Sequence, residues 1–291
     1  MRNKSLALLT TVLAVIILAS CDTKVKVRSK VFRDSEKWGK VVKTNLDIDE
    51  FSEIELWSSA DIEFYQSDTF RAVIEGNEKA INAYKFETVA DTLEDTIPTR
   101  RLIATWNKDL YSSHTPSVRL HIYAPTLHSV QIESDGDIDL KDSVNVGKLA
   151  IRINGAGDVD IRNLECDDLD VNIQGAGDVS VKRIKANSLK ASIDGAGDVH
   201  VRRAILTGDA TLEVNGAGDI EGNIKGRNIL ASSQGAGDID LEVECDEVTV
   251  ISEGAGDVEI EGETKVLKKS RQALGTTTTK KLSAERMEYI K

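Results

Sequence analysis

The residues with the most regular spacing are six aspartates, each at the end of a Gly-Ala-Gly-Asp tetrapeptide. The tetrapeptides follow one another at intervals of 20, 20, 21, 19 and 19 residues. If the repeats stack at about 4.8 Å, the spacing of paired strands, their carboxylates form one column. An oxygen-rich column could hold Ca²⁺, but one carboxylate per repeat supplies few of the six or more ligands that this ion takes. The aspartates are Asp158, Asp178, Asp198, Asp219, Asp238 and Asp257.

A structural role for this aspartate column is the simpler interpretation. An aspartate in a turn accepts hydrogen bonds from backbone N–H groups of its own turn. Glycines on both sides permit a positive φ or a close approach between stacked turns. We therefore expect that the aspartates close the corners, with no metal ligand and no cofactor. Weak calcium binding by this column is the alternative.

The same stacking places further charged residues in rows on the outer face. Two residues after the aspartates, the outward row contains Asp160, His200, Glu221, Asp240 and Glu259. The basic residues beside it are Arg162, Lys182 and Arg202, flanked by Arg183 and Arg203. Later repeats carry Glu242, Glu244, Glu261 and Glu263 instead. We expect the basic residues to neutralise acidic columns on the first coils, and the face to become acidic along the axis. Such a face is either solvated or contacts a partner through charge.

Aromatic and histidine side chains gather in the less regular first half of the chain. Trp57, Trp106, Tyr111 and His114 fall near strand ends and loops, where they could line a pocket for a glycan or a peptide. Packing against the core is the alternative for each. No serine or cysteine has a base at a recognisable catalytic spacing, and the repeats contain no interrupting loop, so we predict that the protein is not an enzyme.

A repeat of about 20 residues requires a stack of coils, because one such unit buries its apolar face only against its neighbours. Alternating apolar residues within each repeat predict short strands around a common interior. The sequence thus predicts an all-β, single-domain parallel β-helix, or β-solenoid, over residues 46–275. Its parts are an irregular first half over 46–133, regular coils over 134–263 and a cap over 264–275. Residues 276–291 are expected to be a mobile basic tail.

The N-terminus has the features of an export signal. A basic start is followed by an apolar run from Leu6 to Leu18, which is short for a membrane span and ends in small residues. The run from Leu18 to Cys21 resembles a bacterial lipobox. That resemblance implies a lipoprotein signal peptide over 1–20 and a lipidated Cys21, and residues 21–45 are predicted to be the tether.

Composition narrows the class of partner. The formal net charge of −12 disfavours nucleic acid and anionic lipid, since both are bound through basic surfaces. Membrane attachment would therefore rest on the lipid anchor. Cys166 and Cys245 lie at similar phases of coils four repeats apart, roughly 19 Å at 4.8 Å per strand, too far for a disulfide.

Several segments together resemble the autotransporter adhesin head GIN domain family, whose function is unknown. They are Phe51 to Gln66, the step Tyr123-Ala124-Pro125-Thr126-Leu127 and the Gly-Ala-Gly-Asp series. The resemblance covers roughly residues 47–275. It implies a right-handed parallel β-helix, frequent in lipoproteins of Bacteroidetes, and it supplies no catalytic residue.

The expected function is that of a noncatalytic, lipid-anchored cell-envelope scaffold, an adhesin or binding protein acting by multivalent contact along equivalent coils. A glycan or an envelope protein is the expected kind of partner. Two alternatives stay open, a carbohydrate-active enzyme with its site in the irregular half and a calcium-stabilised spacer. The expected location is the outer membrane, on its periplasmic or cell-surface face.

Overall fold

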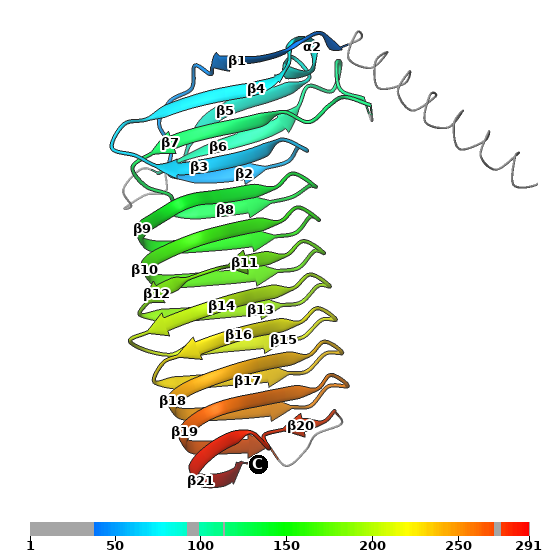
Figure 1. The fold of residues 1–291 in the computed structure, drawn as a ribbon. Helices are drawn as coiled ribbons and strands as arrows, with labels where there is room; N and C mark the ends of the chain where they lie inside the picture. The colour runs from blue at the N-terminus through cyan, green and yellow to red at the C-terminus, as the bar shows by residue number, and fades with distance from the viewer. Residues whose placement is uncertain (1–37, 92–98, 113, 271–274, 291) are drawn as a thin grey trace, which may run out of the picture.

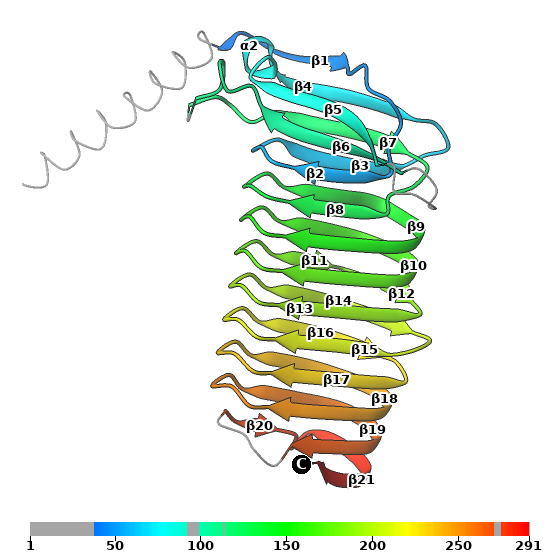
Figure 2. The ribbon, with the colours of Figure 1, turned by 180° about the vertical axis from the view of Figure 1, so that it is seen from behind.

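The protein is a long stack of β-strands, as the computed structural model shows for residues 38–91, 99–112, 114–270 and 275–290. Figures 1 and 2 show the coils piled from the N-terminal end to the C-terminal end. The predicted all-β solenoid is confirmed. The signal peptide, Cys21 and most of the tether lie outside the described residues. No helix within the described ranges is long and apolar enough to cross a membrane.

The regular half consists of strands that pair in parallel with the same part of the next coil. Val159 is in register with Val179, and Val179 with Val199. The strands are β9 (Ile138–Ile153), β10 (Val159–Ile173), β11 (Val179–Val181), β12 (Ile184–Ala186), β13 (Ser188–Ile193), β14 (Val199–Leu206), β15 (Ala210–Val214), β16 (Ile220–Lys225), β17 (Asn228–Ser233), β18 (Ile239–Ser252) and β19 (Val258–Ser270).

The core is one continuous apolar column inside the coils. Along each strand the buried and exposed positions alternate, so β10 buries Val159 and Ile161 and exposes Asp160 between them. The first inward row is completely buried, from Val159 at 0 % to Ile220 and Ile239 at 1 % exposure. Because every coil repeats this pattern, each shields the apolar face of its neighbours from water.

The first half is more than an irregular copy of the second, because its layers are stacked out of sequence order. One coil contains β2 (Glu53–Leu56) and β3 (Asp61–Gln66). It lies between a later coil with β6 (Thr99–Trp106) and β7 (Arg119–Ala124) and another with β8 (Ser129–Ile132) and β9. The chain thus lays down this layer first and later adds one on each side of it.

Antiparallel strands cover the N-terminal end of the stack. β4 (Arg71–Asn77) pairs with β7 on one side and with β1 (Val41–Asn45) on the other, while β5 (Tyr84–Asp91) pairs with β6. A single helical turn, α2 (Glu78–Ile81), follows β4. The fold therefore includes residues 41–45, which the sequence analysis assigns to the tether. An alternation of only five residues next to a Lys-rich stretch is a weak strand signal.

The C-terminal segment also differs from the expectation. In place of a mobile tail after residue 275, the chain forms β20 (Thr277–Thr278) and β21 (Leu282–Ile290), both parallel to β19. Leu282 and Ala284 pack against the core and cover the last coil. This strand could not be predicted from the hydrophobic pattern because charged residues interrupt the alternation in β21.

Close stacking explains the glycines of the repeated corner. A Cβ at Gly197 would lie 2.0 Å from the carbonyl oxygen of Gly177, a distance that no side chain tolerates. Gly39 and Gly262 are the glycines with a positive φ among the described residues. The glycines of these corners are therefore required by the close approach between turns. The expected alternative, a left-handed backbone with positive φ, is wrong for them.

Candidate functional site

The aspartate column lies along the Gly-Ala-Gly-Asp corner and joins one coil to the next. Oδ1 of Asp178 accepts the backbone N–H of Asp198 at 2.8 Å, and Oδ1 of Asp198 accepts that of Asp219 at the same distance. The series runs from Asp137 to Thr276. The expected bond within the aspartate's own turn is thus replaced by a bond between coils, because the corner N–H points along the stack.

These bonds define what the column does in the fold. At each corner a carboxylate takes the place of a backbone carbonyl, so the N–H of the next aspartate is satisfied. In the part of the chain that the structure describes, no three His, Cys, Asp or Glu side chains are grouped as metal ligands. The geometry therefore gives the aspartates a structural role, in which each carboxylate hydrogen-bonds one coil to the next.

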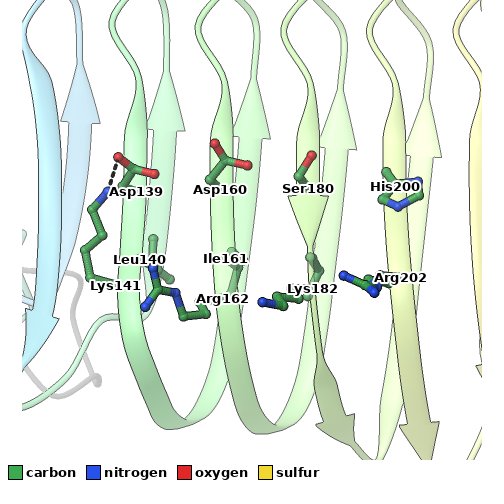
Figure 3. A pocket seen from close by; sticks show the side chains of 11 residues that line it. Asp139, Leu140, Lys141, Asp160, Ile161, Arg162, Ser180, Lys182, His200 and Arg202 are labelled. Carbon is green, nitrogen blue, oxygen red and sulfur yellow. Dashed lines mark hydrogen bonds and ion pairs between the residues drawn. The ribbon is translucent and has the colours of Figure 1, made fainter.

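A shallow hollow of about 360 Å³ lies on the outer face of the first regular coils. Figure 3 shows two rows of side chains across it, each row taking one residue from each of four successive coils. The first row contains Asp139, Asp160, Ser180 and His200. The second row, here called the basic row, contains Lys141, Arg162, Lys182 and Arg202.

The basic row is only partly neutralised. Lys141 lies 2.6 Å from Asp139 and 3.6 Å from Glu63, whereas the one ion pair of Arg162 in the described part of the chain is with Asp142, at 4.0 Å. Lys182 and Arg202 are exposed and have no ion pair within the described ranges. The expected neutralisation of the acidic columns by these residues is therefore wrong for Lys182 and Arg202.

Asp160 lies beside the basic row and has a perturbed carboxyl group. Partial burial raises its pKa, and the nearby carboxylates of Asp139 and Asp158 raise it further, while Lys141 opposes them. The neighbouring Ser180 is neutral, so the row of acids is interrupted at the coil of Lys182. Positive charge therefore dominates the hollow from that coil to Arg202.

The charge of this face reverses along the axis, as the sequence predicts. Asn223 stands one coil after Arg202, and Glu242 and Glu261 follow on the next two. Glu261 is paired with Lys281 from the turn before β21. One end of the face is basic and the other acidic.

A second polar cluster, absent from the sequence-based expectations, lies at the N-terminal end of the same face. His121 on β7 places Nδ1 3.0 Å from Glu63 on β3 and Nε2 2.9 Å from Glu75 on β4. Both contacts are hydrogen bonds to carboxylates when the ring carries two protons. Since β3, β4 and β7 are neighbours only through the out-of-order stacking, no sequence spacing could reveal this cluster.

The carboxyl groups of this cluster respond to their partners. Hydrogen bonds from Lys43 and His121 lower the pKa of Glu75. Burial acts to raise the pKa of Glu63, but the Tyr65 hydroxyl, Lys141, His121 and Arg119 together outweigh it and lower the pKa. The cluster therefore holds both carboxylates in their charged form and ties the N-terminal cap to the coils.

The four aromatic and histidine candidates do not share one environment. Trp106 and Tyr111 pack against the core and against each other, with ring centroids 4.8 Å apart. Trp57 is 44 % exposed, and its Nε1 donates to Glu55. His114 lies in an exposed turn. Core packing, the alternative interpretation, applies to Trp106 and Tyr111.

The two cysteines of the solenoid are free and half-buried. Burial, followed by the nearby acids Asp168 and Asp167, raises the pKa of the Cys166 thiol to about 12. Burial also raises the pKa of Cys245, which donates to the Thr264 hydroxyl at 3.4 Å. Neither thiol is poised as a thiolate nucleophile at neutral pH.

Comparison with known families agrees with the coil architecture. The family described as "Putative auto-transporter adhesin, head GIN domain" matches residues 50–223 and 219–289. The chain belongs to this family. No curated protein matches the sequence.

Solved structures with the same fold come from Bacteroides and Parabacteroides. A "putative adhesin" from Bacteroides fragilis has 22 % identity and a TM-score of 0.67, covering 76 % of this chain and 97 % of its own. A "putative lipid binding protein" from Parabacteroides distasonis has 19 % identity and a TM-score of 0.64, covering 83 % and 97 %. A "putative adhesin" from the same species has 14 % identity and a TM-score of 0.56, covering 87 % and 98 %. At these identities the GIN-domain likeness is one of fold.

Proposed function

We propose that this GIN-domain protein is a noncatalytic binding scaffold, exported and held at the outer membrane by a lipid on Cys21. The observation that supports a binding role most directly is the hollow on the outer face. There four successive coils offer a polar side chain and a cation at the same two positions. A repeating ligand meets the same kind of contact on each coil, so weak contacts add up along the axis.

Several features support a role without catalysis. The regular coils carry their outward residues in rows, with no inserted loop between Gly155 and Gly254 that would bring unique residues together. Both thiols of the solenoid have raised pKa values. The adhesin names of the structural relatives point the same way.

Two experiments test the lipid anchor and the side of the outer membrane on which the protein lies. Replacing Cys21 with serine should release the chain from the membrane fraction, while the wild-type protein stays with it and takes up a labelled fatty acid. External protease should remove residues 38–290 from intact cells if the scaffold works at the surface. Full protection of the chain on intact cells, with digestion after lysis, would contradict adhesion to outside partners.

The binding role is tested separately on the released Cys21→Ser chain. A glycan array together with an array of envelope proteins should show a partner whose retention depends on the outer face. Turnover of any polysaccharide by the purified chain would contradict the noncatalytic assignment.

A further inference from the structure

The basic row has a regular geometry that selects the shape of its ligand. Ile161 is in register with Val181, and Val181 with Val201. The residues that follow them, Arg162 and its counterparts, therefore stand one above another at about 4.8 Å, the spacing of paired strands. Lys141 extends the row by one coil. A ligand that meets all four cations must be a linear chain lying along the solenoid axis.

The positive charge of the basic row favours an anionic ligand. Among the described residues Lys182 and Arg202 have no ion pair, and the contact of Arg162 with Asp142 is long, at 4.0 Å. Arg203 adds a further exposed cation beside Arg202, and Arg183, beside Lys182, donates to Asn163. Exposed cations lose little hydration on meeting an anion, so several of them attract a polyanion even though the whole chain is acidic.

The row next to the cations narrows the chemistry further. Asp139 and Asp160 offer carboxylate acceptors, and Ser180 offers a hydroxyl that both donates and accepts. Carboxylates on this side repel phosphate groups but accept hydrogen bonds from hydroxyl groups. The pair of rows is therefore complementary to a polymer with acids along one edge and hydroxyls along the other.

We propose that the basic row and its neighbouring row bind a polyuronate, a polysaccharide with one carboxylate on every sugar. A pyranose unit of an extended chain is about as long as the distance between neighbouring strands, about 4.8 Å, so successive sugars lie on successive coils. The carboxylates on the side of the chain that faces the basic row contact Lys141, Arg162, Lys182 or Arg202, and hydroxyls bond to Asp160 and Ser180. This assignment rests on the proposed binding function and names its ligand.

The test measures binding of oligogalacturonates to the Cys21→Ser chain by isothermal titration, at low and at high salt. Affinity should rise with length up to about four sugars, one for each coil that lines the hollow, and fall with salt. The variant Lys182→Glu with Arg202→Glu should bind about tenfold more weakly, as expected for two reversed surface charges. A control variant, Arg152→Glu with Lys190→Glu, makes the same change in net charge on exposed residues of β9 and β13 outside this hollow. It should bind like the parent chain.

Each other outcome counts against the proposal in a different way. Equal loss in both variants, or equal affinity for polyphosphate or duplex DNA, would show general attraction between charges and overturn the polyuronate assignment. Equal affinity for a neutral polysaccharide would overturn the role of the cations. Loss of salt-dependent self-association in Lys182→Glu with Arg202→Glu, with no oligogalacturonate bound, would assign the row to a second copy of the chain.

The polyuronate assignment and the binding function can fail separately. No binding of oligogalacturonate, together with a different partner on the arrays, overturns the ligand and leaves the scaffold role intact. Cleavage of polygalacturonate, seen as shorter products, upholds the ligand and overturns the noncatalytic role. Circular dichroism of both double variants checks that the coils are retained, so that a loss of binding reports on the hollow.

Discussion

At the scale of single residues, one tetrapeptide solves two problems of a tightly stacked corner. The glycines remove the Cβ atoms that would collide with the turn below, as at Gly197. The aspartate supplies an acceptor to an N–H that has no carbonyl within reach, as Asp198 does for Asp219. Like charges about 4.8 Å apart repel by about 0.9 kcal/mol even in water. This repulsion is offset by the hydrogen bonds that the carboxylates make to the backbone N–H groups of the corners.

This division of labour predicts different effects for two substitutions of Asp198. Asp198→Ala should lower the free energy of unfolding by about 1 kcal/mol, because the N–H of Asp219 loses its acceptor. Asp198→Asn keeps an acceptor oxygen and removes a charge from between Asp178 and Asp219, so its effect should be much smaller or stabilising. Urea unfolding measures both.

The same two variants test the calcium alternative. Unfolding is repeated with Ca²⁺ and with a chelator. A stabilisation by Ca²⁺ that disappears in Asp198→Asn would show that the column holds the ion and that its role is more than hydrogen bonding.

At the scale of elements, the N-terminal cap is fastened to the coils by polar side chains as well as by strand pairing. Glu75 of β4 contacts Lys43 of β1 at 2.8 Å and His121 of β7 at 2.9 Å. Glu63 of β3 lies on the other side of the imidazole. The cluster therefore spans four strands that are scattered along the sequence, and it holds together layers that the chain visits out of order.

The stability of the cap should depend on pH through these carboxylates. The pKa of Glu75 in the fold lies below its ordinary value of 4.5, so its contribution is complete above that pH and is lost as the pH falls through the folded pKa. Glu75→Gln should destabilise by less than about 1 kcal/mol at pH 6, and the difference from the parent should shrink toward pH 3. Denaturant unfolding between pH 3 and pH 6 measures it, with Glu87→Gln on β5 as the control. A difference that stays constant over this range would show that the carboxylate charge does not fasten the cap.

At the scale of the whole molecule, the regular coils could be predicted because each repeats one pattern against its neighbour. The inward row from Val159 to Val258 and the outward rows of charge follow from a 20-residue period alone. The same period predicts which side chains of neighbouring coils lie beside one another, and so it predicts the basic row. The His121 cluster and the position of β2 and β3 could not be found, because those layers are neighbours in space and distant in sequence. The capping strands β1 and β21 each pair with one neighbour only, among the described strands. β1 could not be predicted because it is only five residues long, and β21 because charged residues interrupt its apolar pattern.

The C-terminal strand gives the clearest test of how the stack ends. Removing residues 276–291 would be harmless if they were a mobile tail. In the structure Leu282 and Ala284 cover the last coil, whose Ile260 and Leu267 are 0 % and 1 % exposed. The truncated chain should therefore melt at a lower temperature and self-associate through the bare edge of β19, because an unpaired strand with an uncovered apolar face recruits another chain. Thermal melting and sedimentation velocity measure these effects, with Met287→Lys, a change at an exposed position of β21, as the control. A truncated chain that stays monomeric and melts like the parent would mean that the coil ending in β19 closes the solenoid by itself.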